Sequence, residues 1–195
     1  MKKPPHNTCT EEIIMRDTGI VRRIDELGRV VIPKEIRKTL RIKESDPLEI
    51  FTDKDSLVIK KYSPISSIGE FAKIVADGIE ELTEKVCVIT DNDAILYLSK
   101  GKMKDLIGKN VSQNLIQVLK DRKSVISSRM DGGTIIPISV DDDFQSENQI
   151  IVPIISNGDC YGACILMDKD KSSHFDGEDV KIVQLGATFL SKQFE

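Results

Sequence analysis

Basic side chains gather in one short stretch of the chain, where their chemistry suits the binding of phosphate groups. Residues 16–43 contain nine Lys or Arg and four acidic residues, a net charge of +5. Residues 62–195 contain 14 basic and 21 acidic residues, a net charge of −7, and the whole chain carries −4. Lys and Arg neutralise phosphates and release condensed counterions. This asymmetry indicates a polyanion-binding module joined to an acidic partner module.

A hairpin followed by a short helix is predicted to position these basic residues. Residues 19–24 and 29–32 are rich in β-branched side chains and flank a tight turn that contains Gly28. Pro33 suits the first position of a helix that is predicted to extend to Arg41. Four basic residues of this helix share one face at spacings of three and four, namely Lys34, Arg37, Lys38 and Arg41.

The N-terminal module, residues 15–62, is too short to be secure as a single folded chain. A second hairpin is predicted from residues 48–51 and 57–62. A unit of this length buries little apolar surface without disulfides, a metal or a partner chain, and it has no set of metal ligands. We therefore expect an obligate dimer through residues 15–62, in which strands from two chains complete one core.

The side chains that are missing from this module restrict how it reads DNA. Residues 15–61 contain no Asn, Gln or His, so the bidentate amide contact to adenine is unavailable. Aromatic residues are limited to Phe51 and Tyr62, which disfavours stacking on single strands. The sequence predicts binding of double-stranded DNA through phosphate contacts and groove shape, with tolerance of varied sequences.

The order of motifs in this module resembles the AbrB-type swapped-hairpin transcription regulators of spore-forming bacteria. The resemblance rests on TGIVRRIDELGRVVIP, the basic helix and the LEIF/VIKKY hairpin. It implies an intertwined dimeric β-barrel with Arg22, Arg29, Arg37 and Lys38 as the principal DNA contacts and Arg23 beside them. Together with the helix face, the predicted DNA-binding residues are Arg22, Arg23, Arg29, Lys34, Arg37, Lys38 and Arg41.

The remainder of the chain is predicted to form an α+β domain, residues 68–195, after a linker at residues 63–67. Asn157-Gly158 between two apolar runs is the strongest hairpin signal. The order of helix, hairpin, helices, long hairpin and helix indicates an antiparallel sheet with flanking helices. The predicted elements are a helix to about Glu84, strands at residues 86–90 and 95–99, a mostly helical segment at 103–122, strands at 149–155 and 161–167, and a helix from Asp176 to about Phe194.

The first and last helices of this domain carry apolar stripes that could bind a second chain. One stripe contains Ile68, Phe71, Ala72, Val75, Ile79 and Leu82. The last helix has two stripes, one with Val180, Val183, Ala187, Leu190 and Phe194 and the other with Ile182, Leu185 and Phe189. Two stripes imply two partners, the sheet and another helix or subunit. For the first helix, a dimer contact and simple packing on its own sheet are equally good interpretations.

In this setting the C-terminal half resembles a GAF domain. The whole chain, with its DNA module, the linker SPIS and the VPI, NGD and GA segments of the long hairpin, resembles the sporulation regulators of this type. This second resemblance implies a sporulation transcription regulator that forms a tetramer through its GAF helices. It also implies a small-molecule effector, although no cyclic-nucleotide signature is present and the ligand class stays open. An antitoxin that regulates its own gene is the alternative, because similar swapped hairpins occur in antitoxins.

Other residues suited to chemistry are better explained by structure. Cys160 and Cys164 lie four apart on a predicted strand and are expected to share one face and pack in a core, with only Cys87 and His174 available to complete a metal site. The Asp141-Asp142-Asp143 run lacks the spacing of a calcium loop. Neither a metal nor a cofactor is expected, and the lack of a nucleophile with a base predicts a protein that is not an enzyme.

The N-terminal residues, the apolar runs and the cysteines of the chain indicate where the protein is located. Residues 1–14 include Pro4-Pro5 and no periodic pattern, which predicts a disordered extension. No apolar run approaches the roughly 18 residues of a membrane span, and four scattered cysteines suit a reducing compartment. We expect a cytoplasmic, nucleoid-associated protein without a membrane partner.

Overall fold

The computed structural model of the chain describes residues 18–44, 46–62, 65, 69–99, 105–140 and 146–194. The chain forms two compact units, residues 1–61 and residues 62–195. The predicted disordered extension (1–14), most of the predicted linker (63–67), Ile68 and the three consecutive aspartates at 141–143 lie outside the described residues.

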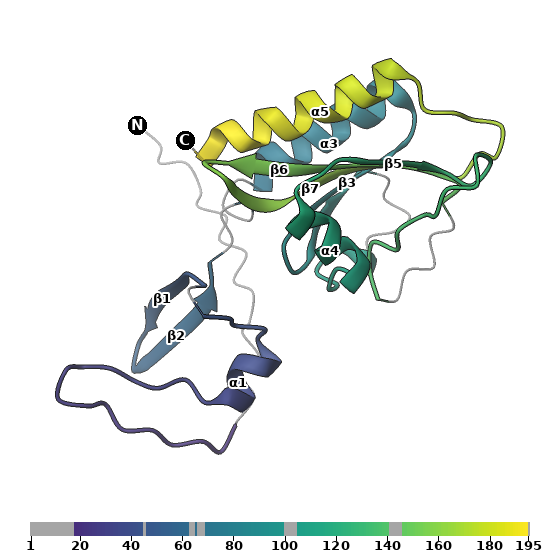
Figure 1. The fold of residues 1–195 in the computed structure, drawn as a ribbon. Helices are drawn as coiled ribbons and strands as arrows, with labels where there is room; N and C mark the ends of the chain where they lie inside the picture. The colour runs from purple at the N-terminus through teal and green to yellow at the C-terminus, as the bar shows by residue number, and fades with distance from the viewer. Residues whose placement is uncertain are drawn as a thin grey trace, which may run out of the picture. The chain divides into compact units, whose positions relative to one another are not determined.

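In the described part of the N-terminal unit, a short helix is followed by a regular hairpin (Figure 1). Helix α1 spans Lys34–Thr39, and strands β1 (Leu48–Asp53) and β2 (Ser56–Lys61) pair in antiparallel fashion. This confirms the predicted second hairpin. The strands predicted at residues 19–24 and 29–32 are not formed within one chain. The turn between these two segments is present. The segments themselves, which we call the two arms, do not pair as strands, because the hydrogen-bond ladder between them is incomplete in a single chain.

The N-terminal unit has no buried residue among those the structure describes between 18 and 62. Large apolar side chains are nevertheless exposed, with Val21 at 85% and Leu27 at 73%. The hairpin adds Ile50 and Leu57, each 61% exposed. A folded unit gains most of its stability from apolar burial. The single chain therefore lacks the core that would hold this unit together.

The C-terminal unit has a five-stranded antiparallel sheet with helices on both faces, which confirms the predicted α+β class (Figure 1). The strand order is β4-β3-β7-β6-β5. Helices α3 and α5 cover one face and α4 covers the other. The elements are α3 (Gly69–Thr83), β3 (Val86–Asp91), β4 (Ile95–Leu98), α4 (Gln113–Asp121), β5 (Val125–Ser128), β6 (Asn148–Ser156), β7 (Asp159–Asp168), α5 (Gly177–Ser191) and the 3-10 turn η2 (Lys192–Phe194).

The turn between β6 and β7 confirms the hairpin predicted at Asn157-Gly158. Both residues have positive φ, +50° and +84°, as a two-residue turn of the mirror-image type requires. Just beyond the turn the register shifts, because Ile154 pairs with Gly162 whereas Ile155 pairs with Cys160. Tyr161 is thus an extra residue in β7, a β-bulge.

The bulge overturns the prediction that Cys160 and Cys164 share one face. Cys160 packs against the core under α4, and Cys164 is buried in the core under α3 and α5. One inserted residue reverses the alternation of side chains along a strand. The Cys164 sulfur instead lies 3.9 Å from that of Cys87, and the hydrogen bond between these thiols, together with burial, raises the pKa of the Cys87 thiol.

The segment at residues 105–122 is less helical than predicted. A regular helix, α4, begins only after Ser112, whose hydroxyl accepts a hydrogen bond from the Leu115 N–H at 3.0 Å. Before it, Asn110 and Val111 form isolated bridges to Ala94 and Ser139. The spacing of apolar residues suited a helix, but at Asn110 and Val111 the chain is extended and pairs with neighbouring segments.

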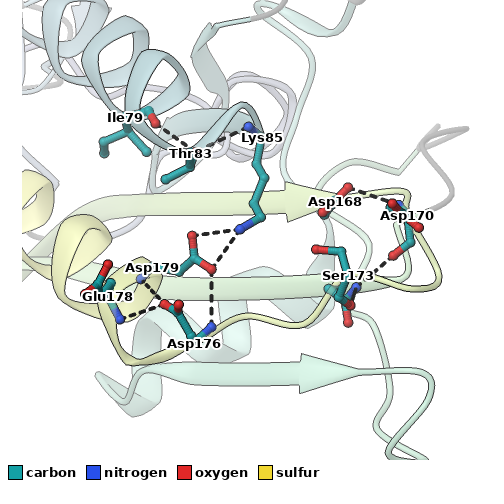
Figure 2. Close-up of polar contacts among 10 residues, drawn as sticks. Ile79, Thr83, Lys85, Asp168, Asp170, Ser173, Asp176, Glu178 and Asp179 are labelled. Carbon is teal, nitrogen blue, oxygen red and sulfur yellow. Dashed lines mark hydrogen bonds and ion pairs between the residues drawn. The ribbon is translucent and has the colours of Figure 1, made fainter.

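Helix α5 is fixed at its first turn by a capping box and a largely buried ion pair. The Asp176 carboxylate accepts hydrogen bonds from the N–H groups of Glu178 and Asp179, and Asp179 accepts one from the Asp176 N–H. The Asp179 carboxylate also lies 2.8 Å from Lys85 Nζ (Figure 2). Lys85 follows the end of α3, so this pair joins the end of α3 to the start of α5.

Replacing Asp179 with Ala should destabilise the C-terminal unit by about 3 kcal/mol, because it leaves the Lys85 ammonium largely buried without its carboxylate and removes half of the capping box. Urea unfolding of the full chain, followed by circular dichroism, measures the loss. Glu178→Ala, at the neighbouring exposed position, should cost much less. Equal losses for the two variants would contradict the importance of the ion pair.

Candidate nucleic-acid interface

The turn between the two N-terminal arms is built around Asp25. The Asp25 N–H donates to the Arg29 carbonyl at 3.0 Å, and the Gly28 N–H donates to the Asp25 carbonyl at 2.9 Å. Gly28 has φ of +76°, a conformation that glycine adopts without steric cost. The turn therefore reverses the chain so that Arg22 and Arg23 lie on one arm and Arg29 begins the other.

The side chain of Asp25 completes the turn and also contacts Arg29. Its Oδ1 accepts hydrogen bonds from the N–H groups of Leu27 at 3.0 Å and Arg29 at 2.8 Å. Its Oδ2 accepts the Arg29 Nε–H at 2.8 Å. The hydrogen bonds from the Arg29 backbone and side chain hold the pKa of Asp25 below its usual value. The carboxylate is thus charged at neutral pH.

Helix α1 presents three of the predicted basic residues on its exposed surface. Its N-terminus follows Pro33, whose carbonyl accepts the Arg37 N–H at 2.9 Å. Lys34, Arg37 and Lys38 are all exposed. Their spacing of three and four residues places them along one side of the helix. This confirms the helical stripe as far as Lys38.

The fourth residue of the predicted stripe, Arg41, lies beyond the helix. The helix ends at Thr39, and Arg41 has φ of +53°. The Ile42 N–H bonds to the Arg37 carbonyl at 2.8 Å and the Arg41 N–H to the Lys38 carbonyl at 3.2 Å. These two bonds form a Schellman motif, which places its C′ residue in the left-handed region. The prediction that the helix and its stripe continue to Arg41 was therefore wrong.

The predicted DNA-contact residues differ in their exposure to solvent. Arg22, Arg23, Arg29, Lys34, Arg37 and Lys38 are exposed, whereas Arg41 is half-buried. The Arg41 Nη1 atom is buried and has no hydrogen-bond partner among the described residues. Asp25 was not among the residues predicted for this surface. Its signal was an Asp at the start of a glycine turn with an Arg four residues later.

Two family models match the chain, and they divide near the boundary between its two units. A family described as "Stage V sporulation protein T C-terminal, transcription factor" matches residues 67–195, and one described as "Antidote-toxin recognition MazE, bacterial antitoxin" matches residues 21–67. Transition state regulatory protein AbrB of Bacillus subtilis (strain 168) is 39% identical over 108 residues, 55% of this chain and 100% of AbrB. The GAF domain of Acinetobacter phosphoenolpyruvate-protein phosphotransferase has a TM-score of 0.54 and 12% identity, covering 65% of this chain and 81% of that chain.

The fold and the basic surface define an AbrB-type transcription regulator whose C-terminal unit has a GAF fold. Stage V sporulation protein T of Bacillus subtilis (strain 168) is 44% identical over 183 residues, 93% of this chain and 99% of that protein. The chain belongs to the stage V sporulation protein T family.

The strained position of Arg41 allows its backbone and side-chain roles to be separated. Arg41→Gly should stabilise the end of α1 by about 1 kcal/mol relative to Arg41→Ala, because only glycine avoids the cost of the left-handed conformation. Both variants lack the same guanidinium, so the Ala variant is the matched control. Hydrogen exchange of the Ile42 amide, which closes the motif, measures the difference. Slower exchange in the Ala variant would contradict this assignment.

Proposed function

We propose that the chain is a sequence-tolerant double-stranded-DNA-binding regulator of sporulation genes whose N-terminal units act as an intertwined dimer. The observation that carries the proposal is the absence of any buried residue among those described between 18 and 62, next to an exposed series of basic side chains. A second chain would bury the apolar residues and pair the two open arms. It would also present every basic residue twice on one surface.

The chemistry of that surface favours phosphates over base edges. Its exposed cations lie on the turn, the arms and one side of α1, and residues 15–61 offer no Asn, Gln or His for adenine. Arg22, Arg23 and Arg29 would contact the duplex from the arms, with Lys34, Arg37 and Lys38 contacting it from the helix. Arg41 remains a proposed contact, with a weaker case because it is half-buried.

The C-terminal unit would join two such dimers through α3 and α5. These helices pack closely at Gly186, where an added Cβ would lie 2.8 Å from Ile79 Cδ1 and 2.9 Å from Val75 Cγ1. The paired helices leave a set of apolar side chains exposed, namely Phe71, Ile74, Leu82, Leu185 and Phe189. Phe71 and Phe189 touch, with ring centroids 6.1 Å apart. A patch of this kind is typical of an interface, and we assign it to the tetramer contact.

Assembly through the helices would allow control by a small-molecule effector. A ligand that favours one helix pairing over another would change the placing of the DNA-binding dimers, and multivalency would amplify the change in affinity. The regulator is proposed to act in the cytoplasm on the nucleoid. Among the described residues, no helix has the length and apolar composition to cross a membrane.

An antitoxin is the second candidate, because the matching MazE family is described as a toxin-recognising antitoxin. That match is confined to residues 21–67, whereas residues 62–195 form the compact second unit with its own sheet. An antitoxin is expected to wrap its toxin with an unfolded tail, and the folded C-terminal unit therefore favours the regulator. The matching C-terminal family is described as a transcription factor and AbrB is named a transition state regulatory protein, which supports a binding protein in preference to an enzyme.

Replacing both Arg22 and Arg29 with Ala should reduce duplex affinity about 100-fold or more, since four guanidinium groups disappear from each dimer. The slope of log affinity against log salt should fall by about 3 to 4. Fluorescence anisotropy at several salt concentrations measures both quantities. Lys120→Ala with Lys123→Ala, which removes two exposed cations from the C-terminal unit, is the control. Unchanged affinity in a folded, correctly assembled Arg variant would rule out the proposed surface.

Leu185→Glu should convert tetramers to dimers, because it places a carboxylate in the middle of the apolar face of α3 and α5. Light scattering coupled to size exclusion measures the mass. Ile126→Glu is matched in chemistry and exposure, at 58% against 71%, but it lies on β5, a strand at the edge of the sheet, and not on α3 or α5. A tetramer that survives the Leu185 change would contradict this interface.

A further inference from the structure

Asp25 places a negative charge inside the stretch that carries the basic surface. A carboxylate there repels DNA phosphates, so a purely electrostatic surface would be improved by its removal. The Asp25 side chain is 43% exposed, so it does not contribute to a buried core. The presence of a carboxylate at this position therefore needs a physical reason other than its charge.

The contact with Arg29 has a geometry that suits positioning. Asp25 Oδ2 meets the Nε–H of Arg29 at 2.8 Å. A guanidinium has five N–H donors, of which the other four lie on its two terminal nitrogens. The Arg29 side chain is 70% exposed, so those nitrogens face solvent. The carboxylate thus fixes the inner edge of the guanidinium and leaves the outer edge for a ligand.

We propose that Asp25 is a positioning residue for DNA binding, which orients the Arg29 guanidinium so that its terminal nitrogens can hold one phosphate through two hydrogen bonds. The inference rests on the proposed function, because it requires Arg29 to contact DNA. Bidentate arginine contacts gain from a guanidinium whose plane is already set. The loss of rotamer freedom then occurs on folding and not on binding.

The competing explanation is that Asp25 only shapes the turn, because its Oδ1 accepts hydrogen bonds from two backbone N–H groups. Asp25→Asn separates the two roles. Asparagine keeps a carbonyl oxygen for the backbone donors, but it loses the charge and the carboxylate that holds the Nε–H. Glu26→Gln is the matched control, since it removes the same charge one residue away from a side chain with no recorded contact to the described residues.

Only Asp25→Asn should weaken DNA binding. In the full chain, Asp25→Asn should weaken binding to a duplex of about four helical turns by about threefold to tenfold, because each dimer loses two exposed charge-assisted contacts. The loss should be similar on an A-tract duplex and a mixed-sequence duplex, as expected for a phosphate contact. Glu26→Gln should leave affinity unchanged or raise it. If Asp25→Asn also raises affinity or leaves it unchanged, the proposal is wrong, and a loss confined to one duplex would overturn the assignment to phosphate.

A double-mutant cycle with Arg29→Ala tests whether Asp25 acts through Arg29. In the Arg29→Ala background, Asp25→Asn should no longer weaken binding. A loss of the same size in both backgrounds would show that Asp25 acts by another route and would overturn the proposal. If Arg29→Ala by itself has no effect on affinity, the proposed DNA surface fails first, which distinguishes the two failures.

A measurement on the unsubstituted protein avoids dependence on the folding of variants. The Arg29 Nε–H should exchange with water more slowly than those of Arg22 and Arg23, because the Asp25 carboxylate accepts its hydrogen bond. Nitrogen-detected NMR of arginine side chains in the full chain reports these rates. Equal exchange at the three arginines would overturn the proposal even if Asp25→Asn does not assemble.

Discussion

The N-terminal half depends on one constraint, which is that a single chain does not bury its own apolar side chains. Side chains such as Val21, Leu27 and Ile50 stay exposed, and the arms beside the turn are not paired as strands. The favourable free energy of apolar burial must therefore come from association. In the dimer that we propose, folding, assembly and the formation of the DNA-binding surface would be one process, and the concentration of protomers would set the stability of that surface.

The basic surface shows how few regular elements are needed to arrange charge. One helix, Lys34–Thr39, supplies three aligned cations, and one turn held by Asp25 and Gly28 sets the arginines of the two arms. The unusual backbone at Arg41 ends the helix and turns the chain towards β1. Local hydrogen bonds therefore define the surface in detail, although they do not supply the core beneath it.

The C-terminal half solves the opposite problem. Its sheet buries apolar side chains of the same chain on both faces. The ion pair of Lys85 with Asp179 and the close packing at Gly186 fix α3 against α5. In the assembly that we propose, the exposed apolar face of this helix pair would contact a second subunit.

The sequence by itself determined the elements whose causes are local. The charge asymmetry, the Asn157-Gly158 turn, the second N-terminal hairpin and the α+β order of the C-terminal unit all follow from composition, turn chemistry and periodicity. The motif order of the first 62 residues was also enough to indicate the family. Much of the candidate surface could be named in this way, because exposed basic residues need no partner to be recognised.

Only the tertiary structure decided features that depend on contacts between distant or irregular segments. The bulge at Tyr161 reverses the faces of Cys160 and Cys164, because one extra residue shifts the alternation of a strand and no pattern in the sequence marks it. Arg41 leaves the helical stripe because the backbone closes a Schellman motif without glycine. The ion pair between Asp25 and Arg29 is also known only from the structure, because a spacing of four residues allows such a pair but does not establish the contact.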